Sequence, residues 1–480
     1  MFNEIDFSKI DTSITPPQDD TDRQYYYMAK LATMTALKKQ ELGRPVTYCL
    51  QTFGCQMNEK QSEVVAGIMD EIGFERQETE DADVVIYNTC TVRENANLKV
   101  YGRLGKLHSL KKSNPEMRIV LFGCMMQEKQ VVEKIQKDYP FVNLVFGTHN
   151  IFKFAELFYE MENRDSQLID IWDGTDKIVE ELPTERSYSF KSGVNIMFGC
   201  NNFCSYCIVP YVRGRERSRE PEAIVKEIEA LVADGVTEVM LLGQNVNSYG
   251  KTLKNPVTFA ELLEKVEQIQ GLKRIRFMTS HPKDLSDELI AYMGKSKKVC
   301  HHLHLPMQSG SSRILKIMNR HYDKEQYLEL VAKIRKAVPD ISLTTDIIVG
   351  FPGETEEDFQ ETLDVVEKCG FDTAFTFIYS RRSGTPAAKM EDQVPEDVVK
   401  DRFDRLLKLV QDKGRAASSR FQGEVQEVLV ETESKEKGIF TGRTQYNLLV
   451  HFSGTKELLG KYINVRLDTC KGFYYMGTRV

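Results

Sequence analysis

Residues 194–207 read Val-Asn-Ile-Met-Phe-Gly-Cys200-Asn-Asn-Phe-Cys204-Ser-Tyr-Cys207. The apolar run Val194–Phe198 predicts a strand, and three cysteines follow it at C-x-x-x-C-x-x-C spacing. Three thiolates this close together suit three irons of a 4Fe–4S cluster and leave the fourth iron open to a small ligand. The alternatives are a zinc site or coincidence. A structural zinc site needs four ligands, and no fourth one lies nearby in the sequence.

Outward from this segment, strand-like and helix-like stretches alternate over residues 188–417. The predicted strands are Val194–Phe198, Glu238–Leu242, Arg274–Met278, Cys300–Leu305, Ser342–Val349 and Thr373–Tyr379. Six strand–helix units predict a barrel-like parallel sheet that is not fully closed, a partial (β/α)6 barrel. Such folds carry their chemistry at the carboxyl ends of the strands.

A second alternation over residues 44–160 predicts a doubly wound parallel sheet. Its strands are Val46–Phe53, Asp83–Tyr87 and Arg118–Phe122, and each is followed closely by one cysteine: Cys55, Cys90 or Cys124. Because parallel strands end at the same edge of a sheet, these three thiols are expected to converge and hold a second cluster with an open iron. The alternative is three unrelated core cysteines.

Three further segments complete an α/β chain. Residues 1–43 form an N-terminal extension, in which Gln24–Leu42 predicts a helix ending at Gly43 and packed on the body of the protein. The charged stretch 161–187 reads as a linker. Residues 418–480 contain short strands and glycine-containing turns, a pattern typical of a small β-barrel.

Five segments carry a family resemblance: Gln51–Asn58, Asn88–Arg93, Leu121–Met125, Gly199–Pro210 and Gly350–Thr355. Together they resemble the radical S-adenosylmethionine (SAM) methylthiotransferases over residues 44–480. The resemblance implies that Cys200, Cys204 and Cys207 hold the 4Fe–4S cluster that binds and cleaves SAM. It also implies that Cys55, Cys90 and Cys124 hold an auxiliary 4Fe–4S cluster that supplies sulfur, and that the terminal barrel resembles the RNA-binding TRAM domain.

Polar residues after the barrel strands are candidates for SAM binding. They are Gln244, Asn245, Ser280, Gln308, Ser309 and Arg381, together with Gly350, Pro352, Gly353 and Glu354 of one strand–helix turn. That turn has a purely structural alternative. His302 and His304 alternate on one strand without a third metal ligand, so they are expected to line or pack the barrel.

Four arginines, Arg213, Arg215, Arg217 and Arg219, alternate along one stretch. In an extended chain they would share one face. Arginine suits phosphates and carboxylates, so the row is a candidate RNA-binding or SAM-binding site. The alternative is a solvated loop paired with Glu216 and Glu220.

Composition limits the function classes. The 480 residues carry a net charge of −7, so an RNA site would have to be a local basic patch on an acidic molecule. Ten cysteines are too few for a disulfide scaffold. No apolar run approaches ~20 residues and the first residues lack a signal peptide, which predicts a cytoplasmic protein that does not enter membranes.

Within the family, the start Gln51–Asn58 resembles the enzymes that act on isopentenyladenosine at position 37 of transfer RNA. The resemblance therefore implies an enzyme that adds a methylthio group to carbon 2 of this nucleoside. The expected partners are the tRNA anticodon loop, a low-potential electron donor such as flavodoxin or ferredoxin, and a sulfur or cluster donor, with the chain itself a monomer. One alternative is the same chemistry on threonylcarbamoyladenosine or on an aspartate of a ribosomal protein. Another is a non-catalytic iron–sulfur RNA-binding protein.

Overall fold

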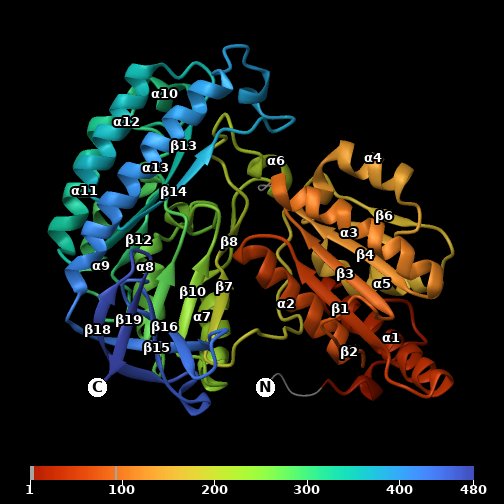
Figure 1. Cartoon of the computed structure of the whole chain (residues 1–480). Coiled ribbons are helices and arrows are strands. Elements are labelled where there is room, and N and C mark those ends of the chain that lie inside the picture. The colour runs from red at the N-terminus through yellow and green to blue at the C-terminus, as the bar shows by residue number, and fades with distance from the viewer. Residues whose placement is uncertain (1–4, 92–93) are drawn as a thin grey trace. The chain divides into compact units, whose positions relative to one another are not determined.

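The computed structural model describes residues 5–91 and 94–480, so Val92 and Arg93 of the Asn88–Arg93 segment lie outside the described residues. The chain divides into two compact units (Figure 1). The first comprises the residues up to Ser187 with Phe198–Cys200 and Ile208–Arg217. The second comprises Tyr188–Met197, Asn201–Cys207 and Ser218–Val480. In the described part, no helix is both long and apolar enough to span a bilayer.

The first unit is built on a six-stranded parallel sheet in the order β2-β1-β3-β4-β5-β6. Its central strands are nearly continuous apolar runs because both faces are covered. The strands are β1 (Thr47–Thr52), β2 (Glu75–Arg76), β3 (Val84–Thr89), β4 (Arg118–Gly123), β5 (Leu144–Phe146) and β6 (Leu168–Asp170).

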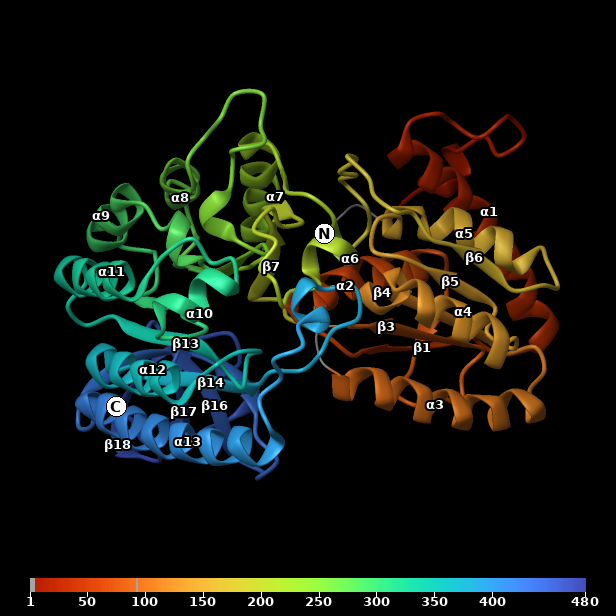
Figure 2. The ribbon, with the colours of Figure 1, turned by 90° about the horizontal axis from the view of Figure 1, so that it is seen from above.

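Alternate strand residues face two separate cores, which confirms the doubly wound sheet. Ile86 and Phe122 pack with α1, α2 and α5, whereas Val85 and Leu121 pack with α3 and α4. Figure 2 shows α3 on one side of the sheet and α1 and α5 on the other. The helices are α1 (Asp20–Leu42), α2 (Gln56–Glu71), α3 (Glu94–Ser113), α4 (Lys129–Asp138) and α5 (Phe154–Glu162).

Two segments outside the predicted sheet domain belong to the same unit. The predicted N-terminal helix is present as α1, begins after the N-cap Asp19 and ends at Gly43 with φ 64°. It packs on α5 through Arg23, which bonds Glu156 at 2.5 Å, and through a shared apolar core. The linker prediction is wrong for part of 161–187, because β6 pairs there with β5 as the last strand of the sheet.

The second unit contains the predicted partial barrel. Its two parallel three-stranded sheets, β7-β10-β11 and β12-β13-β14, are joined by a bridge between Ile275 and Val299. The strands are β7 (Lys191–Asn195), β10 (Glu238–Leu242), β11 (Arg274–Phe277), β12 (His302–His304), β13 (Ser342–Val349) and β14 (Thr373–Ile378). The helices are α7 (Pro221–Ala233), α8 (Phe259–Glu267), α9 (Asp287–Lys295), α10 (Ser312–Ile317), α11 (Lys324–Ala337) and α12 (Glu356–Cys369).

A closed five-stranded barrel in the order β15-β16-β17-β19-β18 ends the chain, as predicted. Its strands are β15 (Val425–Glu433), β16 (Ile439–Thr444), β17 (Leu449–Ser453), β18 (Tyr462–Cys470) and β19 (Tyr474–Arg479), and α13 (Glu396–Ser418) precedes them. Arg274 and Arg276 of β11 donate to the carbonyls of Arg443 and Thr444, at 3.0 and 2.7 Å. The small barrel is therefore attached where the strands of the partial barrel begin, at the end opposite its predicted chemistry.

Candidate metal centres and cofactor site

Cys55, Cys90 and Cys124 lie at the carboxyl ends of the neighbouring strands β1, β3 and β4. Cys90 follows β3 directly, Cys124 follows β4 directly, and Cys55 is the N-cap of α2. Cys90 and Cys124 are buried, whereas Cys55 is exposed. The structure thus brings the three thiols to one edge of one sheet, where the sequence predicts them.

Glycines before two of these cysteines leave room for this arrangement. A Cβ atom at Gly54 would lie 2.5 Å from the side chain of Asn58. Gly123 has φ 107°, and a Cβ atom there would overlap the carbonyl of Thr89. Gly54 is favoured by the close approach alone, and Gly123 by both the close approach and the positive φ. Glycine at these two positions lets the chain turn just before each cysteine.

A buried polar network links the cysteine loops. The Oδ1 atom of Asn58 accepts from Cys55 Sγ at 3.3 Å and from Arg213 at 3.0 Å. Its Nδ2 donates to Asn88 Oδ1 at 2.7 Å and to the carbonyl of Thr89 at 3.0 Å. Asn58 therefore fixes the turn of one cysteine against the strand end of another. This role of Asn58 could not be predicted from the sequence, because its partners are far apart in the chain.

Burial and charge act in opposite directions on a thiol at this edge. The bond with Cys90 and burial raise the pKa of the Cys124 thiol, whereas the positive charge of Arg213 acts in the opposite direction. Within residues 5–91 and 94–480, no three His, Cys, Asp or Glu side chains are close enough to share a single metal ion. A 4Fe–4S cluster binds each thiolate through a different iron. The all-thiol donor set suits such a cluster.

The second cysteine set lies on the loop after β8 (Met197–Phe198). Three residues separate Cys200 from Cys204 and two separate Cys204 from Cys207, so the covalent chain alone keeps the thiols near one another. The loop is held where Ser205 N donates to the carbonyl of Met318 at 3.0 Å. Buried Arg320 lies with its Nη1 atom 3.6 Å from Cys204 Sγ, a cation beside a thiol that sequence reasoning missed.

Several buried polar atoms at the carboxyl ends of β7, β10 and β11 have no hydrogen-bond partner in the described part of the chain. They are Asn195 Oδ1, both amide atoms of Asn247, Ser280 Oγ and His281 Nε2. Unpaired buried polar groups are costly, so such a set fits the binding of a polar ligand. Of the predicted SAM residues, Ser280 belongs to this set. Asn247 and His281 belong to it too, and they lie on the same two loops as the predicted residues Gln244 and Ser280.

The polar groups of other predicted SAM residues form hydrogen bonds within the protein. Asn245 donates to Asp284 at 2.7 Å and accepts from His281 N at 3.1 Å. Ser309 accepts from Ser311 N at 3.2 Å. The backbone of Gln308, with φ 64°, bridges to β13. These residues shape the loops at the barrel mouth, and Gln244 lies directly beside Asn245 in the same segment.

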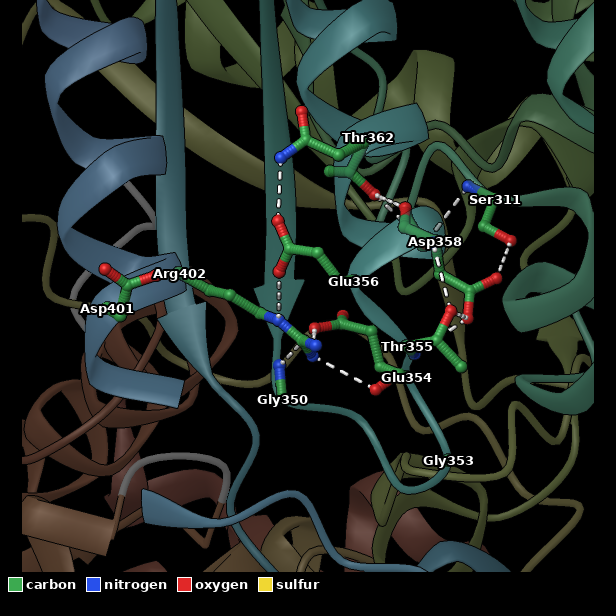
Figure 3. A network of polar contacts seen from close by, with 12 residues as sticks. Ser311, Gly350, Gly353, Glu354, Thr355, Glu356, Asp358, Thr362, Asp401 and Arg402 are labelled. Atoms are coloured by element: carbon green, nitrogen blue, oxygen red, sulfur yellow. Dashed lines mark hydrogen bonds and ion pairs between the residues drawn. The ribbon is translucent and has the colours of Figure 1, made fainter. Parts of the chain in front are cut away.

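The turn Gly350–Thr355 is closed by an ion pair (Figure 3). Arg402 of α13 donates to the carbonyl and to Oε1 of Glu354, both at 3.0 Å, and Glu354 Oε1 accepts from Gly350 N at 3.2 Å. Burial raises the pKa of Glu354 to about 7. The Glu354 side chain thus holds the turn together, which favours the structural alternative for this residue. Pro352 is buried in the same turn, Gly353 has φ 77°, and Arg381 is exposed.

The four arginines do not share a face, so that expectation is wrong. Arg213 ends α6 (Val209–Arg213) and is buried against Asn58. Arg217 of β9 (Arg217–Ser218) donates to the carbonyl of Thr175 at 2.5 Å, and buried Arg219 pairs with Glu227 at 2.6 Å. Arg215 is exposed. The stretch begins in a helix and contains only the two-residue strand β9, so strand-like alternation does not extend over all four arginines.

His302 and His304 pack inside the barrel, as predicted. Each ring bonds Thr344 Oγ1, at 3.2 Å from His302 and 3.0 Å from His304. Burial lowers the pKa of His302 well below its ordinary value. Both rings therefore belong to a hydrogen-bonded layer that lines the barrel.

Comparisons with known proteins agree along the whole chain. Family models match at residues 194–366 (Radical SAM superfamily), 47–147 (Uncharacterized protein family UPF0004) and 419–480 (TRAM domain). A "tRNA-2-methylthio-N(6)-dimethylallyladenosine synthase" of Lachnoclostridium phytofermentans is 65% identical over 91% of this chain and 96% of its own. Proteins of the same name from Acetivibrio thermocellus and Clostridioides difficile are 53% and 51% identical, covering 96% and 97% of this chain and 97% and 98% of their own.

A solved structure is similar in fold. The radical SAM methyltransferase TsrM of Kitasatospora setae, with tryptophan and a SAM analogue bound, matches with a TM-score of 0.51 at 15% identity. The match covers 71% of this chain and 75% of that one. At this identity the likeness supports the architecture and says nothing of substrate.

Proposed function

Because the chain belongs to the family of tRNA-2-methylthio-N(6)-dimethylallyladenosine synthases, we propose that it adds a methylthio group to carbon 2 of isopentenyladenosine (dimethylallyladenosine) at position 37 of tRNA. The observation that carries this proposal is the pair of three-cysteine sets. One set lies at a single edge of the N-terminal sheet, and the other follows the first strand of the partial barrel. Two open-iron clusters are what a reaction needing both sulfur and SAM requires.

The enzyme uses two 4Fe–4S clusters and SAM, which when bound supply the sulfur and the radical chemistry of methylthiolation. In this proposal Cys55, Cys90 and Cys124 hold the auxiliary cluster, and Cys200, Cys204 and Cys207 hold the cluster next to SAM. Arg213 and Arg320 lie buried near one set each, and their positive charge offsets that of the thiolates.

SAM is assigned to the carboxyl ends of the barrel strands. The unpaired atoms of Asn195, Asn247, Ser280 and His281 offer buried hydrogen-bonding groups there, and the backbone of the Gly350–Thr355 turn adds a further wall. Gln244, Gln308 and Gly353 remain predicted SAM contacts. Arg381, which is exposed after β14, is placed to contact either SAM or a phosphate of the RNA. Arg215 is the member of the arginine row that stays accessible to RNA.

The substrate partner is tRNA, consistent with the TRAM domain at the C-terminus. As finer parts of the proposal, the anticodon loop binds the chain, flavodoxin or ferredoxin supplies electrons, and a separate donor restores the sulfur. The enzyme acts as a monomer in the cytoplasm. Residues 44–160, 188–417 and 418–480 act as the sulfur-supplying, SAM-binding and RNA-binding domains.

Anaerobic reconstitution with iron and sulfide tests the function. The purified chain should take up about eight irons, enough for two 4Fe–4S clusters. When a low-potential electron donor and SAM are both added, it should form 5′-deoxyadenosine. With isopentenylated tRNA it should also form a methylthio-nucleoside detectable by mass spectrometry. If the methylthio product forms instead on threonylcarbamoylated tRNA or on a ribosomal protein, that molecule is the substrate. RNA binding without any SAM cleavage would favour the non-catalytic alternative.

A further inference from the structure

Strand β14 exposes an unusual pair of aromatic side chains. It is the edge strand of its sheet (Figure 1), and Phe375 and Phe377 are 49% and 50% exposed. Folded proteins place most phenylalanines in the core, so two half-exposed rings on one strand form an apolar surface that needs an explanation.

The strand register places both rings on the inner face of the partial barrel. Phe375 pairs with Asp346 and Phe377 with Ile348, and residues paired across strands share a face. The opposite face of β13 is buried under α11 and α12, where Leu343, Ile347 and Val349 join the main core. The rings therefore point to the side of the sheet that carries the lining histidines.

Polar side chains that are held by hydrogen bonds lie beside the Phe375 ring. The His304 ring lies edge-on to Phe375 with centroids 5.9 Å apart at 68°. His304 is itself held by Thr344 Oγ1 at 3.0 Å and lies 3.4 Å from Asp346 Oδ2. Exposed Arg381 follows β14 by three residues. Two aromatic rings on β14 thus lie beside hydrogen-bonding groups of β12 and β13, and a positive charge follows the end of β14.

We propose that Phe375 and Phe377 bind the target adenine and its dimethylallyl group, an inference that rests on the proposed function. Nucleobases stack on aromatic side chains, and a basic residue beside them suits the adjoining phosphate. A dimethylallyl group is apolar and gains from contact with phenyl rings. A threonylcarbamoyl group carries a carboxylate, which would lie among apolar rings beside Asp346 and be disfavoured. The pair therefore selects the prenylated base.

The test compares two anticodon stem-loop RNAs, one with dimethylallyladenosine and one with plain adenosine at the target position. Dissociation constants are measured anaerobically with reconstituted enzyme and SAM. The wild type should prefer the prenylated RNA, and the double variant Phe375→Ala/Phe377→Ala should lose about tenfold or more of that preference. Phe377→Leu, which keeps an apolar contact, should retain most of it.

Ile378→Ala is the matched control, because Ile378 is the next residue of the strand, is 51% exposed and points to the other face. It should leave the preference unchanged. A double variant that keeps the wild-type preference, with product still formed, overturns the assignment of this surface and leaves the function standing. A wild-type enzyme that shows no preference and makes no methylthio-nucleoside overturns the proposed function itself.

Discussion

Arg402 is the residue on which the turn after β13 depends. It is buried and is the cation that pairs with the buried carboxylate of Glu354. Removing one partner of a buried ion pair costs about 3–5 kcal/mol, because the other charge is left without compensation. We expect Arg402→Ala to lower the free energy of unfolding by this amount at pH 8, measured by urea denaturation.

Arg405 offers the control for this change. It lies one turn further along α13 and pairs with Glu356 at 2.7 Å, but both side chains are well exposed. Exposed ion pairs contribute about 0–1 kcal/mol, so Arg405→Ala should have little effect. Equal losses in the two variants would show that the burial of the Arg402 pair is not what stabilises the turn.

Glu354 should make stability depend on pH. Burial raises its pKa from 4.5 to about 7, so the folded state favours the protonated carboxyl. This contribution to stability is complete below pH 4.5 and is lost as the pH rises through about 7. As the pH rises over this range, the wild type should lose about 3 kcal/mol of unfolding free energy relative to Glu354→Gln, which cannot ionise. A difference that stays constant with pH would contradict the shifted pKa.

At the scale of elements, the sequence predicts what has a strong local pattern. The strands that carry the cysteines and the six barrel strands were found within a few residues, because apolar runs of β-branched residues bounded by turns are distinctive. Strands β2, β5 and β6 of the N-terminal sheet were not predicted. Leu144–Phe146 and Leu168–Asp170 are three residues long, and β6 lies in a charged stretch, so only pairing with a neighbour defines them.

Helix α1 shows how an extension becomes part of a core. Leu31 is 1% exposed and packs in the same cluster as Phe154 and Phe158 of α5, whereas Leu37 on the same helix is 56% exposed. Leu31→Ala should lower the free energy of unfolding by about 2–5 kcal/mol through loss of burial and the cavity left behind. Leu37→Ala should change it by less than about 0.5 kcal/mol. Similar urea midpoints for both variants would contradict the packing of α1.

At the scale of the whole molecule, the site could be predicted only in part. Each cysteine was placed from the strand before it, because parallel strands end at one edge regardless of what lies between them. The partners of the thiols were not predictable. Asn58 and Arg213 are 155 residues apart, and Arg320 is 116 residues from Cys204, so only the folded chain joins them. The pairing of Glu354 with Arg402 was not predictable either, because Arg402 lies on a distant helix, α13.

Replacing one cysteine set should therefore remove one cluster and leave the other in place. The auxiliary set stands on the N-terminal sheet, whereas Cys204 and Cys207 belong to the barrel unit with the unpaired polar atoms. Replacing Cys55, Cys90 and Cys124 by alanine should leave about four irons per chain and preserve 5′-deoxyadenosine formation, while methylthio-nucleoside disappears. Replacing Cys200, Cys204 and Cys207 should also leave about four irons but abolish 5′-deoxyadenosine. Cys300→Ala, a buried cysteine outside both sets, controls for loss of a thiol and should keep all the iron. If either triple variant loses all its iron while its urea unfolding stays that of the wild type, the two sets hold one shared centre and the separation is wrong.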